Sequence, residues 1–287
     1  MTDQSRLTMD IPSKGRLREP TWTLLEASGV APQLPGERVL QTYCRNANID
    51  LLFVRADDIP EYVQDGVVDC GVTGLDLVAE SGCAVDTLLQ LDFGFCSLQV
   101  AVPLEDTATS IDALGGRRIA TSHPRIADAA FAQRGVNVEL ISVGGSVEIT
   151  PRLGLSDAIV DLVSTGSTLR TNGLRSLGTI FESEAAVIGP RSGEVVGNLR
   201  TLITMLQAVV EARKSRYLLF NVPATALDDV IAVLPSAGSP SVVQLADQSV
   251  VAVQTVVPSS SIWQLLPELE VRGASAILTL PIERMVR

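Results

Sequence analysis

A run of hydroxyl side chains around a glycine follows one apolar segment of the sequence. Residues 158–163, AIVDLV, are apolar except for Asp161, and STGST follows at residues 164–168. A strand that ends in a Gly/Ser/Thr loop and leads into a helix directs backbone N–H groups and hydroxyls at one point, which suits a phosphate. A plain turn with a Ser or Thr N-cap explains the same pentapeptide. The GxxxxGK pattern of a Walker A loop is absent.

Asp161 favours the phosphate interpretation, because a carboxylate inside a buried strand needs a partner or a polar cleft. Beside a phosphate site, a carboxylate suits the hydroxyls of a sugar or a hydrated Mg²⁺ ion. Pairing with an arginine of the core is the structural alternative.

Three further polar junctions contain glycine and follow predicted strands. They are PSKGRL at residues 12–17, the segment from VRADD to TGLD at residues 54–76, and GGSVEITP at residues 144–151. Lys14 and Arg16 bring positive charge to the first junction, Arg55 brings it to the second, and Glu148 brings an acid to the third. Ligands of open α/β sheets lie at the carboxyl ends of strands, so we expect these junctions to form the site. Solvated loop charges are the alternative.

The elements that position these junctions alternate between strands and helices, which predicts mostly parallel sheets covered by helices. Residues 1–92 form one α/β lobe, residues 93–178 form a second lobe that holds the hydroxyl loop, and residues 179–213 return to the first lobe with a long bridging helix. The pattern over residues 214–287 is βαββαβ, the ferredoxin-like order. Two lobes with a cleft between them are therefore expected, followed by a separate small domain.

Composition excludes several classes of function. The net charge of −11 and the pI of about 4.6 argue against non-specific nucleic-acid binding, which needs a basic surface. Neither a signal peptide nor an apolar run long enough to span a membrane is visible. The four cysteines lack CxxC spacing, so we expect reduced thiols in a cytoplasmic protein. The single histidine, His123, is predicted to be a loop residue.

These junctions in this order, with the tail SPSVVQLAD to GASAILTLPIERM, resemble the ATP phosphoribosyltransferase family over nearly the whole chain. The resemblance implies a two-lobed α/β catalytic core like that of periplasmic solute-binding proteins, plus the C-terminal ferredoxin-like regulatory domain of the long form. It implies that N1 of the adenine of ATP is joined to C1 of the ribose of phosphoribosyl pyrophosphate (PRPP). Pyrophosphate is released with Mg²⁺ present, in the first committed step of histidine biosynthesis.

The resemblance also implies roles for individual residues. The catalytic residues would be Lys14, Arg16, Arg55 and Glu148. The residues that bind PRPP would be Asp161, Ser164, Thr165, Gly166, Ser167 and Thr168. The residues that bind the nucleotide would be Lys14, Arg16, Arg55, Thr73 and Gly74. The residues that bind histidine as feedback inhibitor would be Asn221, Ser239, Ser241, Leu245 and Ala274. The ligands of Mg²⁺ stay open, with Asp161 a candidate, and the family often has an acid where Asn221 stands.

The chemistry agrees with a chain that has one histidine and no evident acid/base pair. Adenine N1 is a neutral nucleophile, so catalysis can depend on positioning and on electrostatic stabilisation of the leaving pyrophosphate. A non-catalytic ligand-binding protein on the same bilobal fold, or a regulatory protein whose active part is the βαββαβ domain, is the alternative. The expected partners are ATP, PRPP, L-histidine and further copies of the chain, from dimer to hexamer, without nucleic acid or membrane.

Overall fold

The computed structural model describes residues 6–33, 39–163, 167–191, 193–195, 197–235 and 238–286. The chain divides into two compact units, Met1–Glu26 with Val30–Thr201, and Ala27–Gly29 with Leu202–Arg287. The first unit contains two sheets and the second contains one. None of the described helices is long and apolar enough to cross a membrane.

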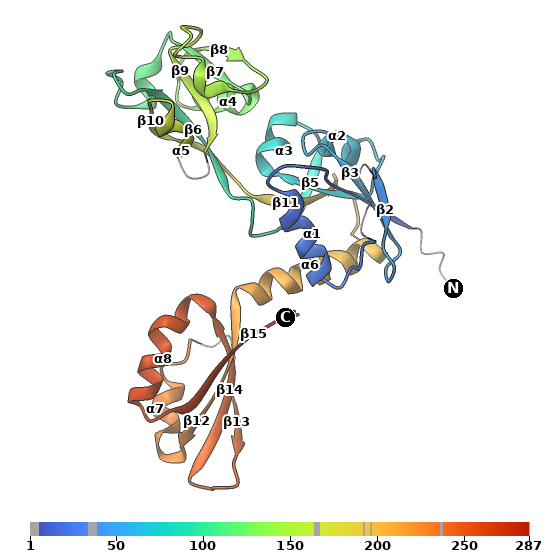
Figure 1. Ribbon diagram of the computed structural model, residues 1–287, viewed down its shortest axis with the longest axis vertical. Helices are drawn as coiled ribbons and strands as arrows, with labels where there is room; N and C mark the ends of the chain where they lie inside the picture. Colours follow the sequence, from blue (N-terminus) through green and yellow to red (C-terminus); the bar gives the residue numbers. More distant parts are fainter. Residues whose placement is uncertain are drawn as a thin grey trace. The chain divides into compact units, whose positions relative to one another are not determined.

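The first lobe is a six-stranded sheet in the order β2-β3-β1-β4-β11-β5 (Figure 1). Its strands are β1 Leu7–Pro12, β2 Gln41–Tyr43, β3 Ile49–Val54, β4 Cys70–Gly74, β5 Val85–Gln90 and β11 Ala185–Pro190, and its helices are α1 Arg18–Ala27, α2 Ile59–Gln64 and α3 Leu75–Ser81. Strand β1 runs parallel to both β3 and β4. The loops after these three strands therefore leave the sheet at the same edge, which brings two of the predicted polar junctions together.

The second lobe is a five-stranded sheet in the order β10-β6-β9-β7-β8. Its strands are β6 Cys96–Pro103, β7 Arg118–Thr121, β8 Glu139–Ser142, β9 Ala158–Val163 and β10 Leu174–Ser183; its helices are α4 Pro124–Gln133 and α5 Ser167–Thr171, with 3₁₀ turns at Ile111–Leu114 and Val147–Ile149. Strands β7, β8 and β9 are parallel, whereas β6 and β10 are antiparallel neighbours. Phe131 of α4 is buried in the core with Leu98 and Ile119.

The return from the second lobe to the first lies later than the sequence analysis placed it. We predicted the boundary between residues 178 and 179, but β10 continues in the second sheet until Ser183, which pairs with Cys96. The chain then enters β11 of the first sheet at Ala185. Pairing with β6, with one register shift between Thr179 and Phe181, keeps residues 179–183 in the second lobe. Nothing in their composition marks this change of sheet.

The second unit has the ferredoxin-like βαββαβ order that the sequence predicted. Helix α6, Gly197–Arg213, leads into β12 Ser215–Pro223, α7 Leu227–Ile231, β13 Ser241–Gln244, β14 Val250–Pro258, α8 Ile262–Val271 and β15 Ser275–Pro281. The sheet is antiparallel in the order β13-β14-β12-β15, and residues of β12 and β14 share an apolar core with residues of α7 and α8. Most of α6 belongs to this unit, because the unit includes the chain from Leu202 onward, whereas the sequence analysis began the domain at residue 214.

Candidate functional site

Positive side chains gather where β1 and β3 end. Lys14 is exposed in the turn after β1, and Gly15 beside it has a left-handed φ of 84°, which glycine adopts without strain. Arg55 follows β3 and donates two hydrogen bonds to Asp57, from Nε to Oδ1 at 3.1 Å and from Nη2 to Oδ2 at 2.6 Å. The hydrogen bond from Arg55 holds the pKa of Asp57 below its usual value, and the charge of Lys14 adds to this effect. Lys14 and Arg55 therefore act on the same carboxylate.

The end of β4 lies at the same edge, but Thr73 and Gly74, which were predicted to bind the nucleotide, contact other residues of the protein. The hydroxyl of Thr73 is buried and donates to the carbonyl of Ala56 at 2.6 Å, which ties β4 to the loop after β3. A Cβ on Gly74 would collide with Oδ1 of Asp76. The structure therefore accounts for Gly74 by the space that the Asp76 side chain needs.

Asp76, which the sequence analysis did not select, is the buried carboxylate of this edge. It lies in the first turn of α3 and is 1% exposed. Its backbone N–H donates to Ser183 Oγ at 2.9 Å, and the Ser183 hydroxyl donates to Asp76 Oδ1 at 2.5 Å. Burial raises the pKa of Asp76, but His123, Ser183 and the charge of Arg16 together outweigh burial and hold the pKa below its ordinary value.

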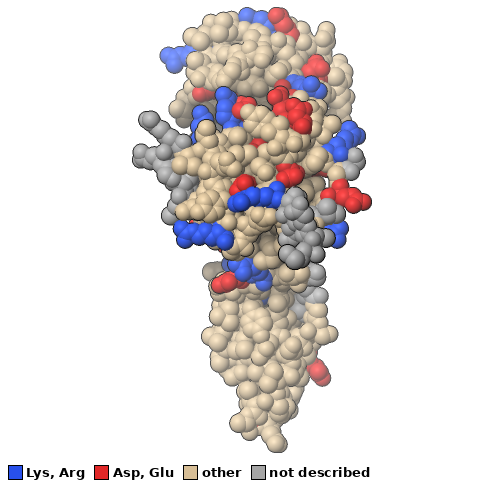
Figure 2. Space-filling view, turned by 90° about the vertical axis from the view of Figure 1, so that its right-hand side faces the viewer, with Lys and Arg blue, Asp and Glu red and all other residues tan. Residues whose placement is uncertain are grey.

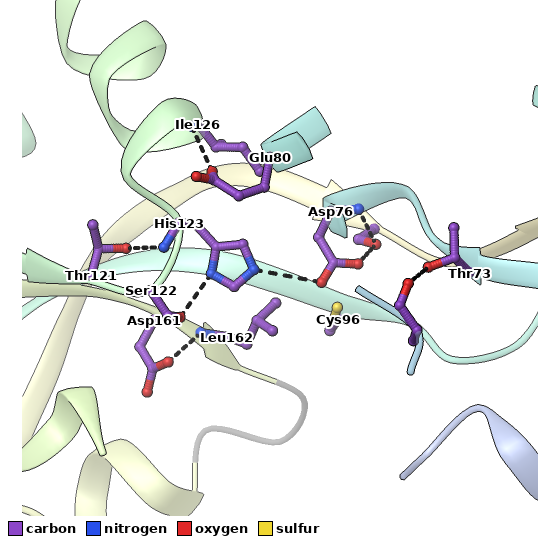
Figure 3. Close-up of polar contacts among 12 residues, drawn as sticks. Thr73, Asp76, Glu80, Cys96, Thr121, Ser122, His123, Ile126, Asp161 and Leu162 are labelled. Atoms are coloured by element: carbon purple, nitrogen blue, oxygen red, sulfur yellow. Dashed lines mark hydrogen bonds and ion pairs between the residues drawn. The ribbon is translucent and has the colours of Figure 1, made fainter. Parts of the chain in front are cut away.

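Arg16 and His123 approach Asp76 from different lobes, and Figure 3 shows the contact with His123. Arg16 Nη2 lies 3.8 Å from Asp76 Oδ1 and donates to Cys96 Sγ at 2.9 Å. His123 Nε2 lies 3.8 Å from Asp76 Oδ2, and Nδ1 lies 2.9 Å from Ser122 Oγ. His123 precedes α4, as a loop residue would, but it is only 5% exposed. The expectation of a loop histidine is therefore correct in position and misses its burial.

The acids of the second lobe lie close to one another. Asp161 is half-buried in β9, and its Oδ1 accepts the backbone N–H of Leu162 at 2.8 Å. Burial raises the pKa of the Asp161 carboxyl, the charge of Glu148 raises it further, and His123 acts in the opposite direction. Glu148 lies in the 3₁₀ turn Val147–Ile149. Glu148 and His123 are therefore each near enough to the Asp161 carboxylate to affect it electrostatically.

The loop after β9 is described only in part. Ser164, Thr165 and Gly166 lie outside the described residues. Ser167 and Thr168 are exposed and begin α5, directly after that loop. The strand and the helix of the predicted strand–loop–helix arrangement are thus both present, as β9 and α5.

The donor set of the second lobe fits Mg²⁺ when a substrate supplies further ligands. The described residues contain no group of three or more His, Cys, Asp and Glu side chains that could hold a metal ion. Mg²⁺ in phosphate chemistry is usually held by one or two carboxylates together with phosphate oxygens. Asp161 and Glu148 provide two carboxylates whose charges interact, so they suit an ion that arrives with a diphosphate.

The five residues predicted to bind the inhibitor do not all come together in the second unit. Ser239 and Ser241 line a pocket of about 270 Å³ with Tyr217, Gln254 and Thr255. Asn221 lies on the same face of the sheet as Tyr217 and Gln254, because Leu219 pairs with Gln254 and residues two apart share a face. Leu245 follows β13 and is partly buried, whereas Ala274 belongs to the apolar core with residues of the two helices.

The chain is similar to known proteins over its whole length. A family model described as ATP phosphoribosyltransferase matches residues 55–208, and the model of the C-terminal domain of HisG matches residues 212–284. An ATP phosphoribosyltransferase of Gemmatimonas aurantiaca is 43% identical, with 98% of this chain and 99% of that protein covered. One from Methanosarcina acetivorans is 41% identical, with 96% and 98% covered.

A solved structure shares the fold of most of the chain. It is the ATP phosphoribosyl transferase (HisG:HisZ) complex from Thermotoga maritima, with a TM-score of 0.59 and 29% sequence identity. The match covers 70% of this chain and 98% of that one.

Proposed function

The chain belongs to the ATP phosphoribosyltransferase family, and we propose that its first unit joins ATP to PRPP at the polar groups that follow β1, β3 and β9. The family makes this protein an enzyme of the first step of histidine biosynthesis and sets aside the two non-catalytic alternatives. Adenine N1 attacks C1 of the ribose, the bond from C1 to the pyrophosphate oxygen breaks, and pyrophosphate leaves. No external base is needed, since N1 already carries a lone pair.

The cations of the first lobe stabilise the phosphates. As the C1–oxygen bond breaks, negative charge grows on the pyrophosphate, and fixed positive groups at that point lower the barrier. The observation that carries the proposal is the effect of both Lys14 and Arg55 on Asp57, which supports two cations from separate strands at one place. Lys14 and Arg16 stabilise the departing pyrophosphate. Arg55 exchanges Asp57 for a phosphate when substrate binds.

The acids and hydroxyls of the second lobe hold the sugar phosphate of PRPP. Asp161 accepts hydrogen bonds from the ribose hydroxyls, and Ser167 and Thr168 donate to the 5′-phosphate together with Ser164, Thr165 and Gly166 of the same loop. Asp161 and Glu148 would hold Mg²⁺ together with the diphosphate. The ion would neutralise part of the pyrophosphate charge. In this proposal the cations that bind phosphate come from the first lobe, and the acids that bind the sugar and Mg²⁺ come from the second lobe.

A turnover assay with ATP, PRPP, Mg²⁺ and pyrophosphatase tests the proposal through the ultraviolet absorption of the product. Lys14→Ala should lower kcat by about 100- to 1,000-fold, the usual loss when one group that stabilises transition-state charge is removed. Lys214→Ala, at the only other lysine, is the matched control and should retain turnover. Equal turnover in Lys14→Ala and the parent would remove Lys14 from the mechanism.

We also propose that L-histidine inhibits the enzyme by binding the pocket of the second unit. The pocket supports this because Tyr217, Ser239, Ser241 and Gln254 line it with hydroxyl and amide groups that suit an amino acid. Calorimetry on the full chain should show weaker histidine binding in Ser241→Ala and unchanged binding in Ser261→Ala, which lies at the start of α8. Equal affinity in both variants would place the inhibitor elsewhere.

Assembly into a homo-oligomer, from dimer to hexamer, is a further part of the proposal. Figure 2 faces the side of the second unit opposite to α7 and α8, and charged side chains are few there. Val243, Leu278 and Leu280 are exposed apolar residues of this sheet, which supports a buried contact. Light scattering coupled to size-exclusion chromatography measures the assembly, and a monomer at micromolar concentration would contradict it.

We place the enzyme in the cytoplasm. The four cysteines support this because none of them is in a disulfide and three are buried. Quantifying free thiols in the protein purified without reductant tests the point, with four thiols expected per chain.

A further inference from the structure

Asp76 takes part in no step of the proposed reaction, yet residues of both lobes contact its carboxylate oxygens. Oδ1 lies near Arg16 of the first lobe. Oδ2 faces His123 of the second lobe (Figure 3). At 1% exposure the carboxylate has almost no access to water. A buried carboxylate is tolerated only when its neighbours compensate for the lost hydration, so the positions of Arg16 and His123 matter to it.

The orientation of the Asp76 carboxylate is fixed by its surroundings. The Ser183 hydroxyl donates to Oδ1 from the end of β10. Gly74 leaves room for the side chain, since any Cβ there would collide with Oδ1. These two contacts come from the strand before α3 and from the strand that returns from the second lobe. The carboxylate is therefore held still before a substrate arrives.

The fixed carboxylate of Asp76 can in turn orient the guanidinium of Arg16. Nη2 of Arg16 is 3.8 Å from Asp76 Oδ1 and donates to Cys96 Sγ, while 37% of the side chain stays exposed. The guanidinium is planar, so fixing one edge fixes the direction of the remaining N–H groups. An exposed lysine would not gain an orientation in this way. The two contacts of Nη2 thus limit the directions in which the other N–H groups of Arg16 can point.

A second contact between α3 and the second lobe lies one turn further along the helix. Glu80 accepts the backbone N–H groups of Arg125 at 3.0 Å and of Ile126 at 3.1 Å, at the start of α4. Residues 76 and 80 share one face of α3. Since α4 has ten residues, a carboxylate at its N-terminus is favoured by the helix dipole. Helix α3 is therefore held against the second lobe at two points.

We propose that Asp76 is a positioning residue that aims Arg16 at the departing pyrophosphate, and that it does so while His123 of the second lobe holds its other oxygen. The proposal rests on the proposed role of Arg16 in the reaction. It means that the geometry of a cation in the first lobe depends on contact with the second lobe, where PRPP is bound. Turnover then requires both lobes to meet at α3.

A double-mutant cycle tests the proposal. Asp76→Asn should lower kcat and kcat/KM by the same factor, about 100-fold, because a misplaced Arg16 loses an interaction made in the transition state. In an Arg16→Ala background, the same substitution should change kcat less than about twofold. His123→Gln should lower kcat and should not add to Asp76→Asn. Asp157→Asn, which breaks the Arg118–Asp157 pair elsewhere in the second lobe, should retain turnover.

The outcomes separate this proposal from the proposed function. Wild-type turnover in Arg16→Ala would remove Arg16 from the mechanism, and the role of Asp76 would fall with it. A low turnover in Arg16→Ala, with Asp76→Asn costing the same factor in both backgrounds, would overturn only the positioning role. A change confined to KM, or an equal loss in Asp157→Asn, would overturn it too. Full turnover in His123→Gln would refute the dependence on the second lobe. Thermal unfolding confirms that each variant is folded.

Discussion

Replacing Asp10 should stabilise the first unit, and the gain should be larger at pH 8 than at pH 5. Asp10 lies within β1, between parallel neighbours β3 and β4, and is fully buried. Neither of its carboxylate oxygens has a hydrogen-bond partner among the described residues. Burial raises the pKa of Asp10 from 3.8 to about 7. At neutral pH and above, the folded protein must therefore hold a charge in an apolar setting.

The sign and size of the effect follow from this pKa. The folded state binds the Asp10 proton more tightly than the unfolded chain does. The free energy of unfolding therefore has its full value below about pH 4, and it falls as the pH rises toward 7. Each pH unit between the two pKa values is worth about 1.4 kcal/mol. The cost of the carboxyl is therefore about 1.5 kcal/mol at pH 5 and about 4 kcal/mol at pH 8, a difference of about 2.5 kcal/mol.

Urea unfolding at the two pH values measures this difference. The chain has two tryptophans, and Trp263 is 90% exposed in the second unit. In a Trp263→Phe background, fluorescence reports Trp22 alone, which stacks on Phe53 in the first unit. Asp10→Asn and Asp10→Val should each gain about 2.5 kcal/mol more over the parent at pH 8 than at pH 5.

Comparing pH values within each variant removes the effects that do not titrate. The asparagine variant would keep an unpartnered amide and the valine variant would repack the strand, but both costs are the same at pH 5 and pH 8. A gain that is equal at the two pH values, within about 0.5 kcal/mol, would refute the reasoning. It would mean that the carboxyl of Asp10 is hydrated or paired in the folded protein.

Three further predictions concern the site and its regulation. Gly74→Ala should displace the Asp76 carboxylate, cost about 1 to 3 kcal/mol of stability and lower kcat. Gly115→Ala is the control and should have neither effect, because a Cβ there meets nothing within 4 Å. Equal thermal midpoints and rates in the two variants would contradict this prediction. Glu148→Gln should lower the pKa of Asp161, because the charge of Glu148 raises it. The acid limb of the pH profile of kcat/KM should then move to lower pH. An acid limb that stays in place would exclude Asp161 as the titrating group. Asn221→Asp should tighten histidine inhibition about tenfold, because a carboxylate binds an ammonium group more strongly than an amide does; unchanged inhibition in the turnover assay would separate Asn221 from the inhibitor.

The sequence predicts where the polar junctions lie because strand ends and glycine turns are local features. Lys14 and Arg55 are brought to one edge by parallel pairing of β1 and β3, which the alternation of strands and helices implies. The roles of Asp76 and His123 are not local. Asp76 looks like an ordinary acid in the first turn of a helix, and its partners Ser183 and His123 come from a distant strand and from the other lobe. Composition carries no signal for either contact.

Arg16 and Arg55, the two arginines of the proposed site, differ in a way that only burial shows. The Arg55 side chain is 64% exposed and its partner Asp57 is 48% exposed, so water screens the pair and a substrate phosphate can replace Asp57. Asp76 is buried, and removing Arg16 from it would leave a charge with less compensation. Arg16 therefore keeps its carboxylate while substrate binds, and Arg55 exchanges its own. Arg55→Ala should then raise KM with a modest change in kcat, whereas Arg16→Ala should lower kcat; the reverse pattern in steady-state kinetics would contradict this division.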